Sequence, residues 1–183
     1  MPYYTGELMI IYYIRHGQPN YEINCLTELG KKQALLLSRR IDLGDVEAVF
    51  SSPSRRAVQT AMPTANALGK DITVLDKCDE ECAWQRFSQE TPEGNRWFYQ
   101  NDAGIRALAK AQNDGSKWWN NAAFGEKIGE NMQWYRDFTD EFMASLGFSH
   151  DRENNSYKCT GEKYKKVALF AHEGAGYAIL SAI

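Results

Sequence analysis

Two features are missing from this sequence: a long apolar run and an excess of positive charge. No segment approaches the roughly 18 apolar residues of a membrane-spanning helix, and the N-terminus lacks the basic and then apolar pattern of a signal peptide. The formal net charge is −3, which offers no general attraction for nucleic acid. We therefore expect a cytoplasmic globular protein that binds neither membranes nor nucleic acids. Its 183 residues suit one domain and leave the oligomeric state open.

Cysteine and histidine are both scarce. The four cysteines are Cys25, Cys78, Cys82 and Cys159. No cysteine or histidine pair follows Cys78 and Cys82 at the spacing of a zinc finger, so we expect free, buried thiols and no metal site. Of the three histidines, His150 lies in a polar stretch that is typical of the surface. The other two each follow an apolar strand.

The first of these histidines follows the segment 9–14, which is β-branched or aromatic and uncharged, as in a buried strand. Arg15, His16 and Gly17 come directly after it. In an open α/β sheet, ligands bind at the carboxyl ends of the strands. A histidine there can act as a nucleophile, and a neighbouring arginine can hold an anion. Glycine lets the chain turn and lets a ligand approach the backbone.

A second apolar strand, 46–50, ends in a Ser-Ser-Pro turn before a predicted helix at 55–68. Ser54 suits the N-cap of that helix. Its first turn carries Arg55 and Arg56, two cations that oppose the helix dipole. Cations at this position, beside free backbone N–H groups, favour a bound anion.

The late strand 167–171 ends in His172 and a glycine-containing turn. A third short strand is predicted at 72–75. Thr27 can cap a helix over 27–41, which joins the first two strands as a parallel βαβ crossover requires. We expect the apolar positions of this helix to include Leu29, Leu36 and Leu37. Another amphipathic helix is predicted at 128–146.

Together these segments resemble the histidine phosphatase superfamily, also called the phosphoglycerate mutase-like fold. The matching motifs occur in the family's order: Arg-His-Gly, Leu-Thr-x-x-Gly-x-x-Gln-Ala, Ser-Ser-Pro-x-x-Arg-Ala-x-x-Thr-Ala and a late strand-His-x-Gly. They cover about residues 9–68 and 165–180. The resemblance implies an α/β fold, a three-layer α/β/α sandwich around a mostly parallel sheet, as a single domain over residues 1–183.

The resemblance also implies a phosphohistidine mechanism that needs no cofactor. By match to the family's motifs, His16 is the nucleophile, and Arg15, Arg56 and His172 line the phosphate pocket. Arg56 is chosen over Arg55 because the family's arginine directly precedes the alanine. The implied partner is a small phosphorylated substrate, and the implied reaction is hydrolysis of a phosphomonoester. Preorganised cations would stabilise the transferring phosphoryl group.

A general acid must protonate the leaving alcohol. In similar proteins an acidic residue after the third strand does so, and four follow it here: Asp76, Asp79, Glu80 and Glu81. Counting from the strand end, Glu80 fits the family's position best, with Glu81 as the alternative.

The chain departs from the family's pattern in two places. Pro19 and Glu22 stand where many members carry a threonine and an asparagine that hold the substrate. Asn20 and Asn24 are the candidates to substitute for them. Glu173 follows the second histidine in place of the usual glycine, and its carboxylate would repel a phosphate unless it points away. We expect Gly17, Asn20 and Glu173 to contact the substrate. The departures argue against a phosphomutase more than against a phosphatase.

Two alternatives remain open, a phosphomutase of the same fold and a non-catalytic phosphate-binding protein. The segment at about 83–129 is rich in aromatic residues and is expected to form a lid or insertion over the pocket, with Trp118 and Trp119 recognising the leaving group. The chain stops at Ile183, and similar proteins usually continue further, so the C-terminus is expected to be truncated.

Overall fold

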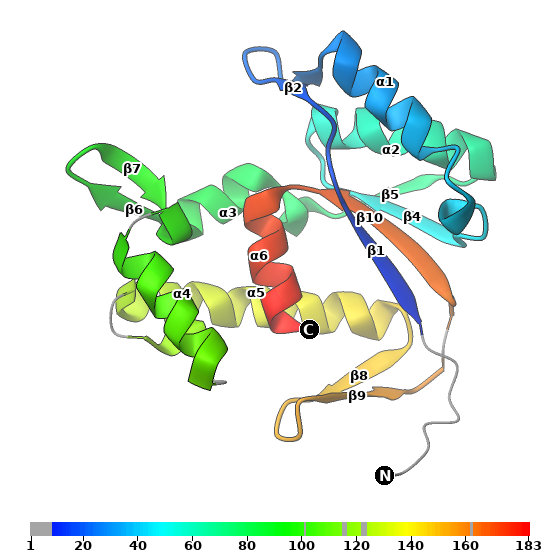
Figure 1. The fold of residues 1–183 in the computed structure, drawn as a ribbon. Helices are drawn as coiled ribbons and strands as arrows, with labels where there is room; N and C mark the ends of the chain where they lie inside the picture. Colours follow the sequence, from blue (N-terminus) through cyan, green and yellow to red (C-terminus); the bar gives the residue numbers. More distant parts are fainter. Residues whose placement is uncertain (1–8, 101, 115–116, 122–123, 162) are drawn as a thin grey trace.

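The computed structural model describes residues 9–100, 102–114, 117–121, 124–161 and 163–183. Its centre is a four-stranded parallel sheet in the order β1-β10-β4-β5 (Figure 1). The strands are β1 (Ile10–Arg15), β4 (Ala48–Ser51), β5 (Ile72–Val74) and β10 (Lys166–Ala171). In β10 the residues from 167 to 171 are all buried, as expected for a central strand that is covered on both faces. The prediction of a mostly parallel sheet is confirmed.

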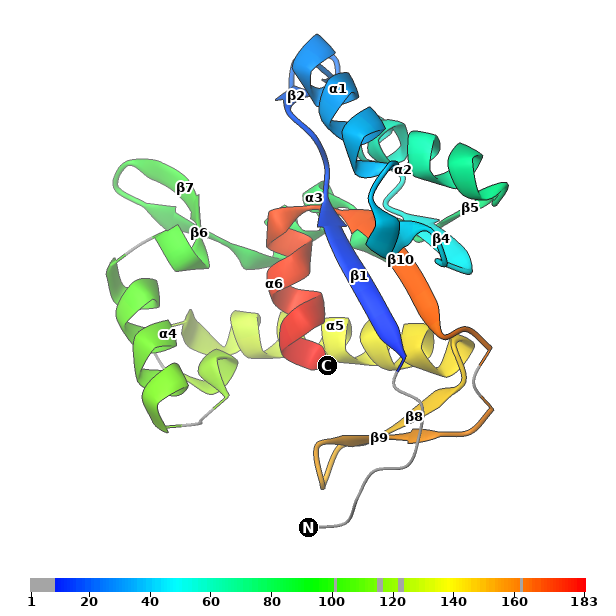
Figure 2. The same cartoon turned by 45° about the vertical axis from the view of Figure 1, so that its right-hand side comes forward.

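Helices cover both faces of this sheet. On one side lie α1 (Glu28–Leu37) and α2 (Arg55–Leu68), and on the other lie α3 (Glu80–Phe87), α5 (Gly125–Ser145) and α6 (Glu173–Ala182), as both views agree (Figure 1, Figure 2). Successive side chains of a strand point to opposite faces. Ala168 and Phe170 accordingly pack into the core with α2, whereas Val167 and Leu169 join the core with α5 and α6. The α/β/α layering is therefore confirmed.

The first crossover helix, α1, begins as predicted but buries a different set of residues. Thr27 is its N-cap, and the threonine hydroxyl accepts a hydrogen bond from the Gly30 amide at 3.1 Å. The residues that α1 buries are the small Gly30 and Ala34. Leu29 and Leu36, two of the predicted apolar positions, are 51% and 64% exposed and do not face the core. A close approach of α1 to its neighbours requires the small residues to face inward.

The aromatic-rich segment folds beside α5 and α6. It comprises the hairpin of β6 (Ser88–Thr91) and β7 (Gly94–Trp97), the 3-10 turn η3 (Phe98–Gln100), α4 (Asp102–Asp114) and the 3-10 turn η4 (Trp118–Asn120). Trp118 stacks on Phe98 with ring centroids 4.6 Å apart, and its indole N–H donates to the Ser181 hydroxyl of α6. These contacts hold the segment against α6.

Two further hairpins lie outside the central sheet: β2 (Pro19–Asn20) with β3 (Cys25–Leu26), and β8 (Phe148–Asp151) with β9 (Ser156–Cys159). The 3-10 turns η1 (Ile41–Leu43) and η2 (Asp76–Cys78) precede β4 and α3. The second hairpin carries His150, whose side chain is only 2% exposed. Its Nδ1 lies 2.7 Å from a carboxylate oxygen of Asp140, and its ring stacks on Tyr157. His150 is therefore a packed residue, and the prediction that it lies at the surface is wrong.

All four cysteines are free, but only two are buried, namely Cys25 and Cys78. Within the described residues, no group of three histidine, cysteine, aspartate or glutamate side chains has the arrangement to hold a metal ion. None of the helices described has both the length and the apolar character that crossing a bilayer requires.

Candidate active site

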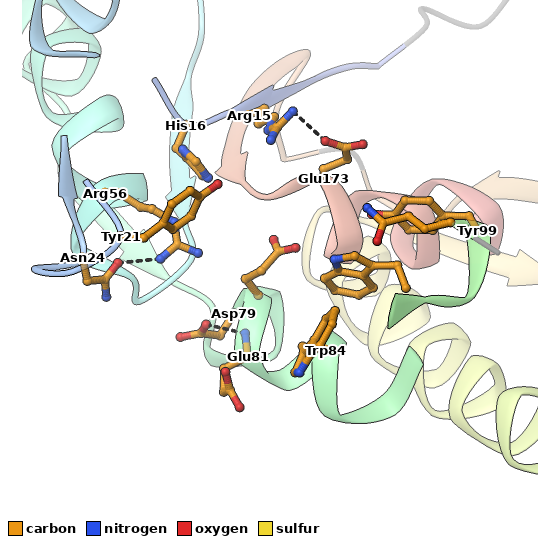
Figure 3. A pocket seen from close by; sticks show the side chains of 13 residues that line it. Arg15, His16, Tyr21, Asn24, Arg56, Asp79, Glu81, Trp84, Tyr99 and Glu173 are labelled. Atoms are coloured by element: carbon orange, nitrogen blue, oxygen red, sulfur yellow. Dashed lines mark hydrogen bonds and ion pairs between the residues drawn. The ribbon is translucent and has the colours of Figure 1, made fainter. Parts of the chain in front are cut away.

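A pocket of about 670 Å³ opens at the carboxyl ends of the parallel strands (Figure 3). The register of β1 on β10 pairs Arg15 with Ala171, so the next residues, His16 and His172, lie side by side. The His16 amide donates to the Ala171 carbonyl, and the two imidazole centroids are 5.1 Å apart. The side chains that line the pocket are those of Arg15, His16, Tyr21, Asn24, Arg56, Asp79, Glu80, Glu81, Trp84, Trp97, Tyr99, Gln100 and Glu173.

The His16 ring is oriented by the carbonyl of the next residue. Its Nδ1 lies 2.8 Å from the Gly17 oxygen, and a carbonyl oxygen can only accept, so Nδ1 carries the proton. Burial lowers the pKa of His16 below its usual value, and the charges of Arg56 and Arg15 lower it further against the opposing effect of the Gly17 carbonyl. The ring is therefore neutral near pH 7, and the lone pair of its Nε2 is free to act as a nucleophile.

His172 is fully buried between a serine and an arginine. The NH2 group of Arg56 donates to Nδ1 of His172 at 3.2 Å. Nε2 of His172 therefore carries the proton and donates to the Ser52 hydroxyl at 2.8 Å. Burial lowers the pKa of His172 to about 3, with further lowering by the charge of Arg56. The structure thus holds His172 as a neutral ring in one tautomer.

Arg56 lies in the first turn of α2 and is buried, whereas its neighbour Arg55 is exposed. Its NH1 donates to Oδ1 of Asn24 at 2.6 Å. Asn24 adopts a left-handed conformation with φ 51°, which asparagine tolerates better than most residues. Burial lowers the pKa of Arg56, since the charged guanidinium has lost water. A partly desolvated guanidinium that is held in place suits a bound phosphate.

Arg15 makes its closest contact with a carboxylate. Its guanidinium lies 2.6 Å from Glu173, and both side chains are about half exposed at the rim of the pocket (Figure 3). Glu173 was expected to repel a phosphate unless it points away. Its carboxylate does line the pocket, but it faces the Arg15 guanidinium. Arg15 is thereby shared between Glu173 and any anion that enters the pocket.

The two candidate acids differ in their surroundings. One carboxylate oxygen of Glu80 accepts from the Gly174 amide at 3.2 Å, and the other lies 3.4 Å from Nδ1 of His172. This second oxygen, Oε2, is buried without a hydrogen-bond partner. Glu81 is exposed, and its carboxylate accepts from Gln85 along the same helix. The geometry favours Glu80, whose unpartnered oxygen lies beside the histidine pair.

Several predicted substrate contacts lie elsewhere. Trp118 and Trp119 do not line the pocket, because they pack among Phe98 and the end of α6. The amide oxygen of Asn20 accepts from the Glu22 backbone, and Asn20 does not line the pocket either.

Gly17 is required by packing rather than by a contact inside the pocket. A Cβ at this position would lie 2.8 Å from the Gly30 carbonyl oxygen, so a larger residue would push α1 away. The Gly17 amide donates to the Thr60 hydroxyl of α2.

Tyr21 lines the pocket and was not predicted to do so. Three further aromatic residues of the lining, Trp84, Trp97 and Tyr99, belong to the aromatic-rich segment that was predicted to lie over the pocket, but none of the three was chosen as an individual contact. One signal could have identified the first of them. Trp84 lies four residues after Glu80 on α3, so the two side chains share a helix face. Asn24, which accepts a hydrogen bond from Arg56, was predicted only as one of two asparagines that could replace the family's substrate-binding threonine and asparagine.

The lowered pKa values of the two active-site histidines predict how both respond to acid. Both rings should stay neutral as the pH falls through 6.5, the ordinary value, so the lone pair on Nε2 of His16 should remain available there. An unfolded chain binds protons in this range and the folded chain does not, so the free energy of unfolding should fall as the pH drops from 6.5 towards 3. NMR of ¹³C-labelled histidine, assigned with His16→Ala, checks this. Titration of both rings at or above pH 6.5 would contradict it.

Comparison with known proteins gives a consistent result. Residues 11–183 match the profile of the histidine phosphatase superfamily (branch 1). A Hydrogenobacter thermophilus protein named "Putative phosphoserine phosphatase 2" is 34% identical over 38% of this chain, and the match spans 39% of that protein.

Two solved structures share the fold. A mycobacterial glucosyl-3-phosphoglycerate phosphatase aligns with a TM-score of 0.52 at 22% identity, covering 93% of this chain and 79% of its own. A phosphoserine phosphatase of Entamoeba histolytica aligns with a TM-score of 0.54 at 16% identity, covering 94% and 78%. The family match spans nearly the whole chain, and this chain therefore belongs to the histidine phosphatase superfamily.

Proposed function

We propose that this chain is a phosphatase that hydrolyses a small phosphomonoester through a phosphohistidine on His16. The single observation that carries the proposal is the hydrogen bond from Nδ1 of His16 to the Gly17 carbonyl. It fixes the tautomer in which Nε2 is unprotonated, beside a desolvated arginine that can hold the phosphate.

The reaction has two steps. Nε2 of His16 attacks phosphorus while the bond from phosphorus to the alcohol oxygen breaks, and the protonated Glu80 carboxyl gives its proton to that oxygen. A water then attacks the phosphohistidine, gives a proton to the Glu80 carboxylate, and releases inorganic phosphate with His16 restored. Arg56 and Arg15 stabilise the charge on the equatorial oxygens during both steps.

The test is hydrolysis of p-nitrophenyl phosphate in the presence of EDTA. We expect turnover to persist, because the two steps above use only side chains of the chain itself. A ³²P-labelled substrate should leave acid-labile, base-stable label on the enzyme when the reaction is quenched. A folded protein that binds phosphate but shows neither turnover nor label would overturn the proposal in favour of a phosphate-binding protein. Phosphoserine belongs among the first natural esters to assay, since two relatives are named for it.

A further inference from the structure

The pocket has two chemically different ends (Figure 3). His16, Arg56 and Asn24 lie together at one end, where the phosphate would bind. Trp84 and Tyr99 lie across from them, at the end that would receive the leaving group. The character of this second end decides which alcohol the enzyme releases.

Negative charge outweighs positive charge around the cavity. Its lining contains two guanidinium groups and four carboxyl groups, those of Asp79, Glu80, Glu81 and Glu173. One of the two guanidinium charges, on Arg15, is already paired with Glu173 at 2.6 Å. Arg56 is directed to the phosphate end by Asn24. Against the lowering by burial, Asp79 in turn raises the pKa of Arg56, so both guanidinium groups of the lining already face a carboxylate. Even with Glu80 protonated for its role as the acid, three carboxylates outnumber the two guanidinium groups and the lining keeps a net negative charge.

Aromatic faces complete the leaving-group end of the pocket. Trp84 meets Trp97 edge to face with centroids 5.0 Å apart, and Trp97 stacks on Tyr99 at 5.7 Å. Gly174 leaves room for Trp97, because a Cβ at position 174 would lie 2.2 Å from the indole ring. The face of an aromatic ring carries partial negative charge and attracts cations. Burial and the nearby Glu173 raise the pKa of Tyr99, so its hydroxyl stays neutral and leaves no competing charge.

We infer that the leaving group carries a positive charge, so that the substrate is a phosphomonoester of an amino alcohol with a primary or quaternary ammonium. This inference rests on the proposed phosphatase function and names the substrate class of the same site. Indole faces together with carboxylates bind an ammonium group, whereas a carboxylate on the leaving group would meet the like charges of the pocket wall. An ester of an anionic alcohol, such as 3-phosphoglycerate, should be a poor substrate.

The test compares esters that differ in the charge of the leaving alcohol. We expect kcat/KM for phosphocholine or phosphoethanolamine to exceed that for glycerol 3-phosphate by about tenfold, and 3-phosphoglycerate to be slowest. Glu173→Gln and Trp84→Leu should each reduce this preference. Glu153→Gln, which removes the same charge in the exposed β8–β9 turn, is the matched control and should leave it unchanged. Equal rates, or a preference for 3-phosphoglycerate, would overturn the inference.

Binding separates this inference from the proposed function. His16→Ala lacks the proposed nucleophile, so calorimetry on this variant measures affinity without turnover. Phosphocholine binding tighter than glycerol 3-phosphate supports a cationic leaving group even if the wild type hydrolyses no ester, in which case only the phosphatase proposal fails. Binding that is no tighter than that of glycerol 3-phosphate overturns the inference even if p-nitrophenyl phosphate is hydrolysed rapidly.

Discussion

His16→Ala should lower kcat/KM for p-nitrophenyl phosphate by about 10⁴-fold or more, because the proposed phosphohistidine route loses its nucleophile. The adjacent His172 ring cannot replace His16 as the nucleophile. Nδ1 of His172 accepts from Arg56, and its Nε2 donates to Ser52, so neither nitrogen is free to attack phosphorus. The acid-labile phosphoenzyme should disappear together with the activity. Phosphate binding should weaken much less, since Arg56 and its partner Asn24 remain.

The remaining histidine supplies the control for this experiment. His150 is also buried, but it packs in the β8–β9 hairpin against Asp140 and Tyr157, away from the pocket lining. His150→Asn should lower the melting temperature while leaving kcat/KM per folded molecule within about threefold, as loss of a buried contact mainly affects stability. Retention of substantial activity and of labelled phosphoenzyme in His16→Ala would instead place the nucleophile elsewhere.

The sequence predicted those parts of the molecule that depend on local patterns. Apolar strands followed at once by His16 or His172 predict a site at the sheet edge, because parallel strands end on the same side. The order of motifs predicted the α/β/α layering that the two cores now confirm. Arg56 was chosen over Arg55 because it directly precedes Ala57. The structure agrees with that choice, since Arg56 is buried and Arg55 is exposed.

Contacts between distant segments were beyond prediction. Trp118 and Trp119 were chosen as an adjacent pair, but their position depends on how η4 meets η3 and the end of α6, which no local pattern encodes. The same holds for Trp97, whose place in the pocket depends on the absence of a side chain at Gly174, 77 residues later in the sequence. The ion pair between Arg15 and Glu173 was likewise unforeseen, because it requires the register of β1 on β10.

Replacing Glu80 with glutamine should slow the enzyme in a way that depends on the leaving group. For an alkyl phosphate, kcat/KM should fall by about 10²- to 10⁴-fold, the usual contribution of a general acid. For p-nitrophenyl phosphate the fall should be far smaller, because p-nitrophenolate departs without a proton. Glutamine keeps the shape of the side chain and can still accept from the Gly174 amide. The loss is therefore one of proton transfer rather than of packing.

Glu81→Gln is the matched variant, since it makes the same change, from carboxyl to amide, at the next residue of the same helix. Its side chain is exposed and bonds to Gln85, so kcat/KM for both esters should change less than about threefold, as for most surface substitutions. A larger loss in Glu81→Gln than in Glu80→Gln would transfer the acid role to Glu81. An equal loss for alkyl and nitrophenyl esters in Glu80→Gln would show that Glu80 positions the N-terminus of α6 without protonating the leaving oxygen. The buried, unpartnered Oε2 of Glu80 beside His172 is the reason to expect neither result.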